Sequence, residues 1–192
     1  MDDSLAPQPP HHRHRRNEVA KARCHKAFRA TAKFDNDPKL EMRRRPKFLV
    51  LIGDSEDALR ESLKLMLPRC LAATYHLEFD HCRYGEDLIG MASRRKYHLF
   101  VLVLNNIPFR HPLPDGFTRL ARAVDLVSHL RSKYRRPVVA LTAWNPRGLG
   151  ARVEAAGADV FLVTPFHADL FTDLVSTCLS TADHGGSTIF NA

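Results

Sequence analysis

From residue 48 onward, short apolar runs alternate with stretches that carry apolar residues at helical spacing. Four of the runs are apolar at nearly every position, which is typical of strands covered on both faces of a parallel sheet: residues 48–52, 99–104, 138–142 and 160–163. A fifth run, residues 75–80, alternates apolar with polar side chains and predicts a half-exposed strand. Residues 99–104 form the most apolar run, so we expect that strand at the centre of the sheet.

A helix is predicted after each strand. The first helix has Leu59, Leu63, Met66 and Leu67 on its inward side and Pro68 near its end. The others are expected at residues 88–92, 117–134, 147–156 and 167–179. Because parallel strands need a crossover between them, five strand-and-helix units predict an α/β fold. We expect a doubly wound, five-stranded parallel sheet with helices on both faces.

Charge is distributed unevenly along the 192 residues. Residues 1–47 contain 13 Lys or Arg and 6 Asp or Glu, a net charge of +7, whereas residues 48–192 contain 16 and 15. Low hydrophobicity combined with high charge predicts that residues 1–47 form a basic, mostly disordered arm. We therefore expect three parts: this arm, a folded domain over residues 48–182 and a flexible tail over residues 183–192.

The basic arm points to an anionic partner. Nucleic acid, an acidic protein and an anionic membrane surface would all be attracted by the same Coulomb interaction, and a solubilising tail has the same composition. The arm lacks interleaved aromatic side chains for base stacking and has no recognised reading motif. If it binds nucleic acid, we expect the contacts to come from Arg13, Arg15, Arg16, Arg43, Arg44 and Arg45.

The sequence predicts neither a membrane span nor a metal site. No apolar run reaches the roughly 18 residues that cross a bilayer, and the N-terminus lacks the apolar segment of a secretory signal, so we expect a cytoplasmic protein. The cysteines are widely spaced and are expected to be free thiols: Cys24, Cys70, Cys82 and Cys178. Cys24 with its neighbouring histidines lacks the paired spacing of structural zinc sites, and no cofactor is predicted.

Three separated stretches then carry a family resemblance. They are Gly-Asp-Ser-Glu-Asp-Ala-Leu after the first strand, Leu-Thr-Ala at the end of the fourth, and residues 157–166 around the fifth. In this order they resemble the receiver domain of two-component response regulators, over residues 48–182. The resemblance implies a flavodoxin-like strand arrangement, in which ligand sites lie at the carboxyl ends of the strands.

For an active receiver, the resemblance implies two acidic residues after the first strand and a phosphate-accepting Asp after the third. It also implies a Ser or Thr after the fourth strand and a Lys before the Pro after the fifth. Here Gly53 and Asp54 replace the acidic pair, and Thr164 occupies the Lys position. The acceptor position falls on Val103 when counted from His98 and on Leu104 when counted from Pro108. The degenerate pocket would comprise Asp54, Val103, Leu104, Asn105, Thr142 and Thr164.

Phosphoryl transfer needs a nucleophile, a metal ion and positive charge aimed at the transferring group. An aliphatic side chain provides no nucleophile, and the amides of Asn105 and Asn106 are neither suitable nucleophiles nor strong magnesium ligands. We therefore expect no enzymatic activity. The predicted function is a phosphorylation-independent, receiver-like module that regulates signalling or transcription through protein contacts.

Two matched residues keep a switch-like role open. Thr142 and Phe161 stand where family residues couple the pocket to the surface of the fourth helix, fifth strand and fifth helix. The simpler interpretation is that Thr142 caps a strand end and Phe161 fills the core. The bond between Thr164 and Pro165 matches a cis bond in the family, so a cis peptide is predicted.

The surface made by the fourth helix, fifth strand and fifth helix is the expected contact region for a protein partner or a second copy of the chain. The residues expected on or near it are Arg147, Arg152, Val153, Leu170 and Asp173. A long, proline-rich loop over residues 109–115 is expected near the mouth of the former site. There it would block the pocket or display a contact surface, unless it is a tolerated insertion.

An esterase is the remaining alternative. Gly53-Asp54-Ser55 is similar to the Gly-Asp-Ser block of the SGNH hydrolases, with Ser55 as the nucleophile. Asn105 or Asn106 and His167 would then have to complete the site. The family's Gly-x-Asn-Asp block is absent, and no Asp lies three residues before His167, so this remains a remote alternative.

Overall fold

The protein is described by a computed structural model that covers residues 45–112 and 118–183. The chain divides into two units, residues 1–41 and 42–192, and all the described residues belong to the second unit. The predictions for the arm, including Cys24 and every arm arginine except Arg45, lie outside the described residues. The predicted tail, apart from Asp183, lies outside them as well.

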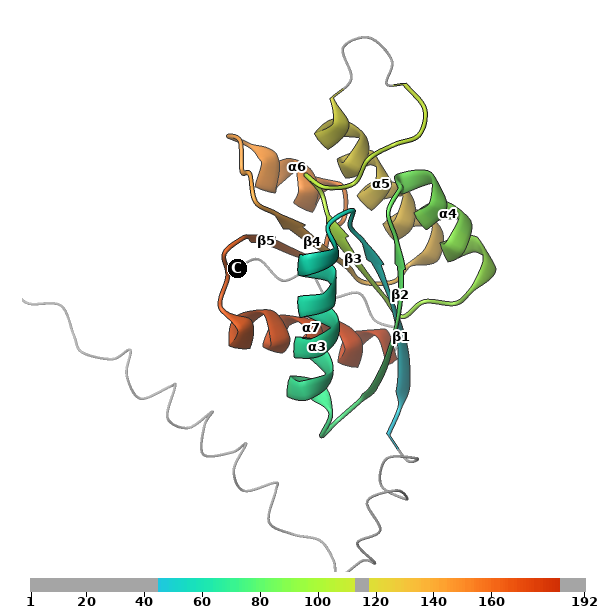
Figure 1. Cartoon of the computed structure of the whole chain (residues 1–192), viewed down its shortest axis with the longest axis vertical. Helices are drawn as coiled ribbons and strands as arrows, with labels where there is room; N and C mark the ends of the chain where they lie inside the picture. The colour runs from blue at the N-terminus through green and yellow to red at the C-terminus, as the bar shows by residue number, and fades with distance from the viewer. Residues whose placement is uncertain (1–44, 113–117, 184–192) are drawn as a thin grey trace, which may run out of the picture. The chain divides into compact units, whose positions relative to one another are not determined.

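One parallel sheet organises the described part of the chain (Figure 1). Its strands lie in the order β2-β1-β3-β4-β5, which is the receiver or flavodoxin arrangement. The central strand is β3, as the apolar pattern predicts, and all of its residues are buried. The strand bounds are Lys47–Gly53 for β1, His76–Cys82 for β2, Leu99–Val103 for β3, Val138–Thr142 for β4 and Val160–Val163 for β5.

Helices cover both faces of the sheet, as predicted (Figure 1). Helices α3 and α7 pack on one face, where the side chains of Val50, Val101 and Val139 are buried. Helices α4, α5 and α6 pack on the other face, over Leu51, Phe100 and their neighbours. The helix bounds are Asp57–Leu71 for α3, Gly85–Arg94 for α4, Arg119–Tyr134 for α5, Leu149–Ala155 for α6 and Ala168–Asp183 for α7.

Element boundaries differ from the sequence prediction where packing outweighs local signals. Helix α3 continues through Pro68 to Leu71, because Leu67 and Leu71 both lie in the core on either side of the proline. Strand β2 begins one residue later than predicted and extends to Cys82, which is buried. The peptide bond between Thr164 and Pro165 is cis, as predicted.

Candidate functional site

The parallel register brings the carboxyl ends of the strands to one edge of the sheet. Val103 pairs with Leu141, and Thr142 pairs with Val163, so the residues that follow β3, β4 and β5 are neighbours. Asp54 follows β1, which pairs with β3. The predicted pocket residues therefore lie along this edge: Asp54, Val103, Leu104, Asn105, Thr142 and Thr164. We call this edge, together with the adjacent Asn106, the acceptor edge.

Asp54 is the carboxylate of this edge and is fully buried. Its Oδ1 accepts a hydrogen bond from the N–H of Glu56 at 3.0 Å, whereas Oδ2 has no hydrogen-bond partner among the described residues. Burial raises the pKa of Asp54, and the hydrogen bond from Glu56 N–H and the nearby Asn106 side chain oppose that rise. At Gly53, an added Cβ would lie 2.6 Å from Leu88 Cδ1, so a second acidic side chain would displace a buried leucine.

Both candidate acceptor positions belong to the hydrophobic core. Val103 is buried on the α3 and α7 side of the sheet, and Leu104 is buried on the α4, α5 and α6 side. The N–H of Leu104 donates to Leu141 O at 2.8 Å, which extends the pairing of β3 with β4 by one bond. Whether the acceptor position is counted from His98 or from Pro108, it holds a buried aliphatic side chain.

Two asparagines connect the β4 end of the acceptor edge with Asp54. Asn105 Oδ1 accepts from the N–H of Ala143 at 2.9 Å, and Asn105 Nδ2 donates to Asn106 Oδ1 at 2.6 Å. The Asn106 side chain in turn lies beside Asp54, where it lowers the pKa of that carboxyl. The two neutral amides thus lie between the loop after β4 and the loop after β1. The N–H of Ala143 is already used, because it donates to Asn105.

The hydroxyl of Thr142 is used within its own loop. Oγ1 donates to Trp144 O at 2.7 Å and lies 3.2 Å from the Trp144 N–H, which donates to it. The carbonyl of Thr142 accepts from Thr164 N–H at 2.8 Å. Phe161 is half-buried, and its ring would lie 3.4 Å from a Cβ built on Gly150. These contacts agree with the interpretation of Thr142 as a strand cap and Phe161 as a packing residue.

Arg60 contacts the candidate site, and the sequence reasoning did not include it. Only 8% of it is exposed, and its Nη1 donates to Asp54 O at 3.4 Å. Its guanidinium also forms an ion pair with Asp57. The signal was available, because positions 60, 63, 67 and 71 share the inward side of α3 and all are buried.

The esterase alternative finds no support in the geometry. The N–H of Ser55 donates to Asn106 O at 3.3 Å, which fixes the loop, but no hydrogen bond in residues 45–112 and 118–183 joins Ser55 to a histidine. His167 is exposed, just before α7. The described residues also contain no group of three or more His, Cys, Asp or Glu side chains placed to hold a metal ion.

The predicted contact surface is largely exposed. Arg147, Arg152 and Asp173 are exposed, and 44% of Leu170 is accessible. Val153 has to be removed from this surface, because it is fully buried in the core. It lies four residues after the buried Leu149, so the two side chains share the inward side of α6.

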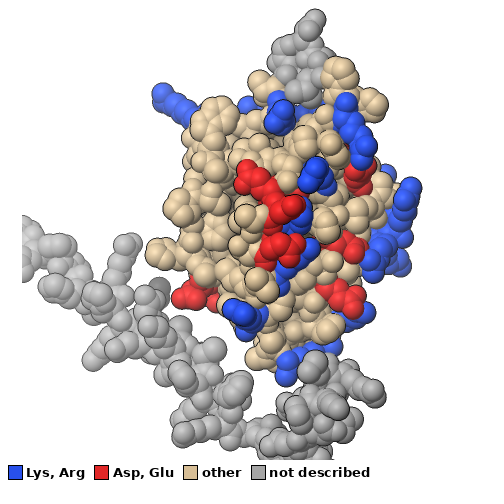
Figure 2. Space-filling model, in the orientation of Figure 1, with Lys and Arg blue, Asp and Glu red and all other residues tan. Residues whose placement is uncertain are grey.

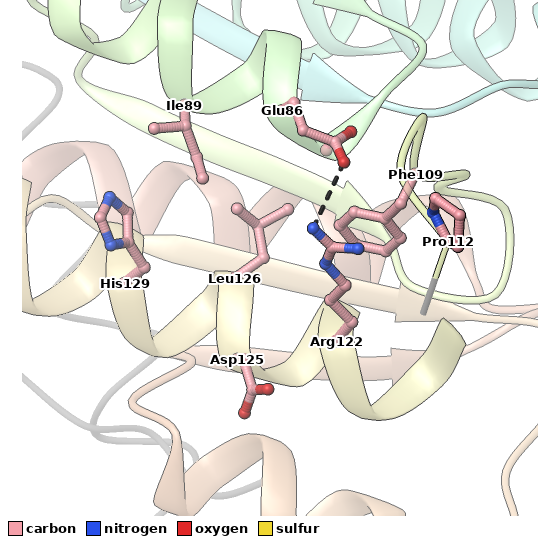
Figure 3. A pocket seen from close by; sticks show the side chains of 9 residues that line it. Glu86, Ile89, Phe109, Pro112, Arg122, Asp125, Leu126 and His129 are labelled. Atoms are coloured by element: carbon pink, nitrogen blue, oxygen red, sulfur yellow. Dashed lines mark hydrogen bonds and ion pairs between the residues drawn. The ribbon is translucent and has the colours of Figure 1, made fainter. Parts of the chain in front are cut away.

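The loop after β3 is described as far as residue 112. Asn106 O accepts from Ser55 N–H at 3.3 Å and Pro108 O accepts from Gly85 N–H at 3.0 Å. Beyond them, Phe109 and Pro112 lie on the seam between α4 and α5 (Figure 3). Phe109 packs against Gly85, where an added Cβ would lie 2.2 Å from the phenyl ring. Arg110 pairs with Asp87 at 2.6 Å. Glycine at the start of α4 makes room for the phenyl ring, so this part of the loop does not block the former pocket.

A cavity of about 500 Å³ lies along this seam. Figure 3 shows Ile89, Leu126 and Phe109 forming its apolar wall, while the ion pair of Glu86 with Arg122 closes one end at 3.4 Å. The Arg122 guanidinium also stacks over the Phe109 ring at 4.6 Å. The polar groups at this end of the cavity, Glu86 and Arg122, are therefore already paired with each other.

Comparison with known proteins identifies the fold. No family model matches the sequence, and no curated protein matches it. A signal receiver domain of a histidine kinase from Clostridium thermocellum is 14% identical, with a TM-score of 0.55 over 69% of this chain and 97% of that one. A two-component response regulator from Clostridium difficile is 22% identical, with a TM-score of 0.54 over 69% and 96%. The receiver domain of Francisella response regulator 1452 is 16% identical, with a TM-score of 0.53 over 69% and 97%.

The described part of the chain therefore has the receiver-domain fold that the sequence resemblance implies. At these identities the likeness extends to the fold alone, so any chemistry has to be argued from this chain's own residues. Among the described helices, none is long and apolar enough to cross a membrane.

Proposed function

We propose that this chain is a non-catalytic, receiver-like regulatory module that works without phosphorylation, through protein contacts in signalling or transcriptional control. The observation that carries this proposal is the packing of the acceptor edge. Val103 and Leu104, the two candidate acceptor positions, are both buried, and the amides of Asn105 and Asn106 extend from Ala143 toward Asp54.

The chemistry of phosphoryl transfer supports this proposal. The reaction depends on a nucleophile, a metal ion and cationic groups that stabilise the charge of the transferring phosphoryl group. At the acceptor edge, the nucleophile position is aliphatic, and the only carboxylate is one buried group whose pKa is raised. Thr164 at the Lys position supplies no positive charge. A cytoplasmic location is part of the proposal, in line with the free thiols of Cys70, Cys82 and Cys178.

The proposed contact surface is the edge of the sheet formed by α6, β5 and α7. Among the described strands, β5 pairs only with β4 and is therefore the last strand on its side of the sheet. Leu170 gives this region an exposed apolar residue, and Arg147, Arg152 and Asp173 add charges of both signs. A mixture of one apolar anchor and opposite charges suits either a second copy of the chain or a protein partner.

The test uses the only tryptophan, which is directly beside the acceptor edge. Trp144 is 62% exposed, and both its N–H and its carbonyl are held by Thr142. The full chain is incubated with Mg²⁺ and either acetyl phosphate or beryllofluoride, with an active receiver as the reagent control. We expect no phosphoryl adduct by intact mass spectrometry and no change in Trp144 fluorescence. A stoichiometric adduct on the folded protein would overturn the proposal.

The charge of the arm favours a second candidate function, which is binding of nucleic acid. The net charge of +7 lies within residues 1–47. If six arginines of this arm neutralise phosphates, affinity for duplex DNA should fall about a thousandfold between roughly 50 and 200 mM salt. Fluorescence anisotropy at several salt concentrations measures this slope, and Arg43→Glu/Arg44→Glu/Arg45→Glu should flatten it. A slope near zero would exclude the candidate function.

A further inference from the structure

A second cavity opens beside the acceptor edge, between the start of α3, the end of β2 and α4. Its volume is about 610 Å³, which is within the range that binds small organic ligands. Four of the residues that line it carry basic side chains: Arg60, His81, Arg83 and Arg94. We call it the basic cavity. In Figure 2, acidic side chains gather over α3, and Lys and Arg side chains gather along the edge of the molecule at α4.

The acidic side chains of the basic cavity are already neutralised. Asp87 pairs with Arg110 at 2.6 Å, and Glu86 pairs with Arg122 at 3.4 Å. By contrast, the guanidinium groups of Arg83 and Arg94 form no hydrogen bond or ion pair with any other residue of the described ranges. Two uncompensated guanidinium groups therefore line the same cavity.

The cations at the inner wall of the basic cavity already have carboxylate partners. Arg60 is 8% exposed, its guanidinium pairs with Asp57, and its Nε lies 3.7 Å from Glu61 Oε1. Lys64 Nζ pairs with the same Glu61 oxygen at 3.0 Å. Lys64 Nζ lies 3.4 Å from His81 Nδ1. Burial and the nearby charges of Lys64 and Arg60 lower the pKa of His81, and the carboxylates of Glu61 and Asp57 oppose this effect. A further positive charge at this wall is thus disfavoured.

We propose that the basic cavity binds a phosphorylated small molecule of nucleotide size, with its phosphate held by Arg83 and Arg94. The planar guanidinium group presents paired N–H donors that match phosphate oxygens, which makes arginine suited to this contact. A cavity of about 610 Å³ far exceeds the space that one inorganic phosphate requires, so an organic part of the ligand also fits. Arg60 lines the same cavity, and its guanidinium is paired with Asp57.

The full chain and two double variants test this proposal by isothermal titration calorimetry. The probes are ADP, adenosine and inorganic phosphate. Arg83→Ala/Arg94→Ala should weaken ADP binding about tenfold or more, which is the loss of at least one charge-assisted hydrogen bond. The matched control is Arg69→Ala/Arg119→Ala, which removes the same charge from exposed positions that do not line the cavity. The control should bind ADP as the wild type does.

The comparison of probes decides what the cavity recognises. ADP should bind more tightly than phosphate, adenosine should not bind, and amide resonances of Arg83 and Met91 should shift with ADP. Equal losses in both double variants would show non-specific attraction and overturn the proposal. So would equal binding of adenosine and ADP, or an absence of ADP binding at millimolar concentration. Binding of duplex DNA through Arg83 and Arg94 without ADP binding would reject the small-molecule assignment.

Discussion

The acceptor edge and the basic cavity lie on either side of Arg60 but differ in how their polar groups are used. At the acceptor edge, Asn105 and Thr142 bond to neighbouring protein groups, and the central position is the buried Leu104. In the basic cavity, the guanidinium groups of Arg83 and Arg94 have no partner among the described residues. Polar groups that have protein partners stabilise the fold, whereas uncompensated cations on an open cavity remain available to a ligand.

One side chain connects the two regions. Arg60 contacts the carbonyl of Asp54 at 3.4 Å on one side and lines the basic cavity on the other. It also forms an ion pair with Asp57 in the first turn of α3. An anion in the basic cavity would compete with Asp57 for the Arg60 guanidinium. Both residues lie at the start of α3, so this helix end contacts both regions. The substitutions below change the acceptor edge alone and leave the residues of the basic cavity in place.

The largest effect is expected from a carboxylate at the acceptor position. Leu104→Asp places a charge in a fully buried, apolar site and should lower the free energy of unfolding by about 4 kcal/mol. Chemical denaturation followed by Trp144 fluorescence measures this change. Leu104→Met is the control and should cost less than about 1.5 kcal/mol, because it conserves volume and polarity. Equal stability of Leu104→Asp and wild type would mean that the edge is open to solvent.

A smaller effect is expected from breaking the amide chain. Asn106→Ala removes the group between Asn105 and Asp54 and should cost about 1–2 kcal/mol, since Asn105 Nδ2 loses its acceptor. The pKa of Asp54 should rise further, because the Asn106 side chain lowers it. Denaturation and carboxyl NMR measure the two changes. Asn145→Ala, at an exposed position, is the control and should leave both unchanged.

The fold was predictable because its signals are local and repeated. Each apolar run became a strand of the sheet, and the run at 99–104 became the central strand β3, which is buried throughout. The errors are at boundaries, where tertiary contacts decide. Pro68 did not end α3, because the buried Leu71 beyond it holds the last turn against the sheet.

The candidate site was predictable only in part. The strand ends correctly placed Asp54 and Thr142 at one edge, since parallel strands all end on the same side. The position of the loop after β3 depends on Gly85, which leaves space for Phe109 some 24 residues along the chain, and no local pattern reveals such a contact. The basic cavity was not predictable for the same reason. Which arginines have carboxylate partners depends on tertiary contacts, and the sequence pattern does not show these.

The smallest effect is expected from removing the charge of Asp54. Burial raises its pKa in the folded protein above the value in the unfolded chain, so the folded state retains the proton longer as pH rises. Stability therefore falls as pH rises from the unfolded pKa through the folded pKa and stays reduced above it. Asp54→Asn keeps the acceptor for Glu56 N–H and should stabilise the protein at pH 7 by about 1 kcal/mol.

Thermal unfolding of Asp54→Asn and wild type across acidic and neutral pH checks this prediction. The two curves should converge below the unfolded pKa of Asp54, where the wild-type carboxyl is protonated in both states. Affinity for ADP should be unchanged, because Arg60 bonds to the main-chain carbonyl of residue 54 and not to its carboxylate. If the variant is instead less stable at pH 7, the Asp54 carboxylate has a stabilising partner, and the acceptor edge retains a binding function that its packing conceals.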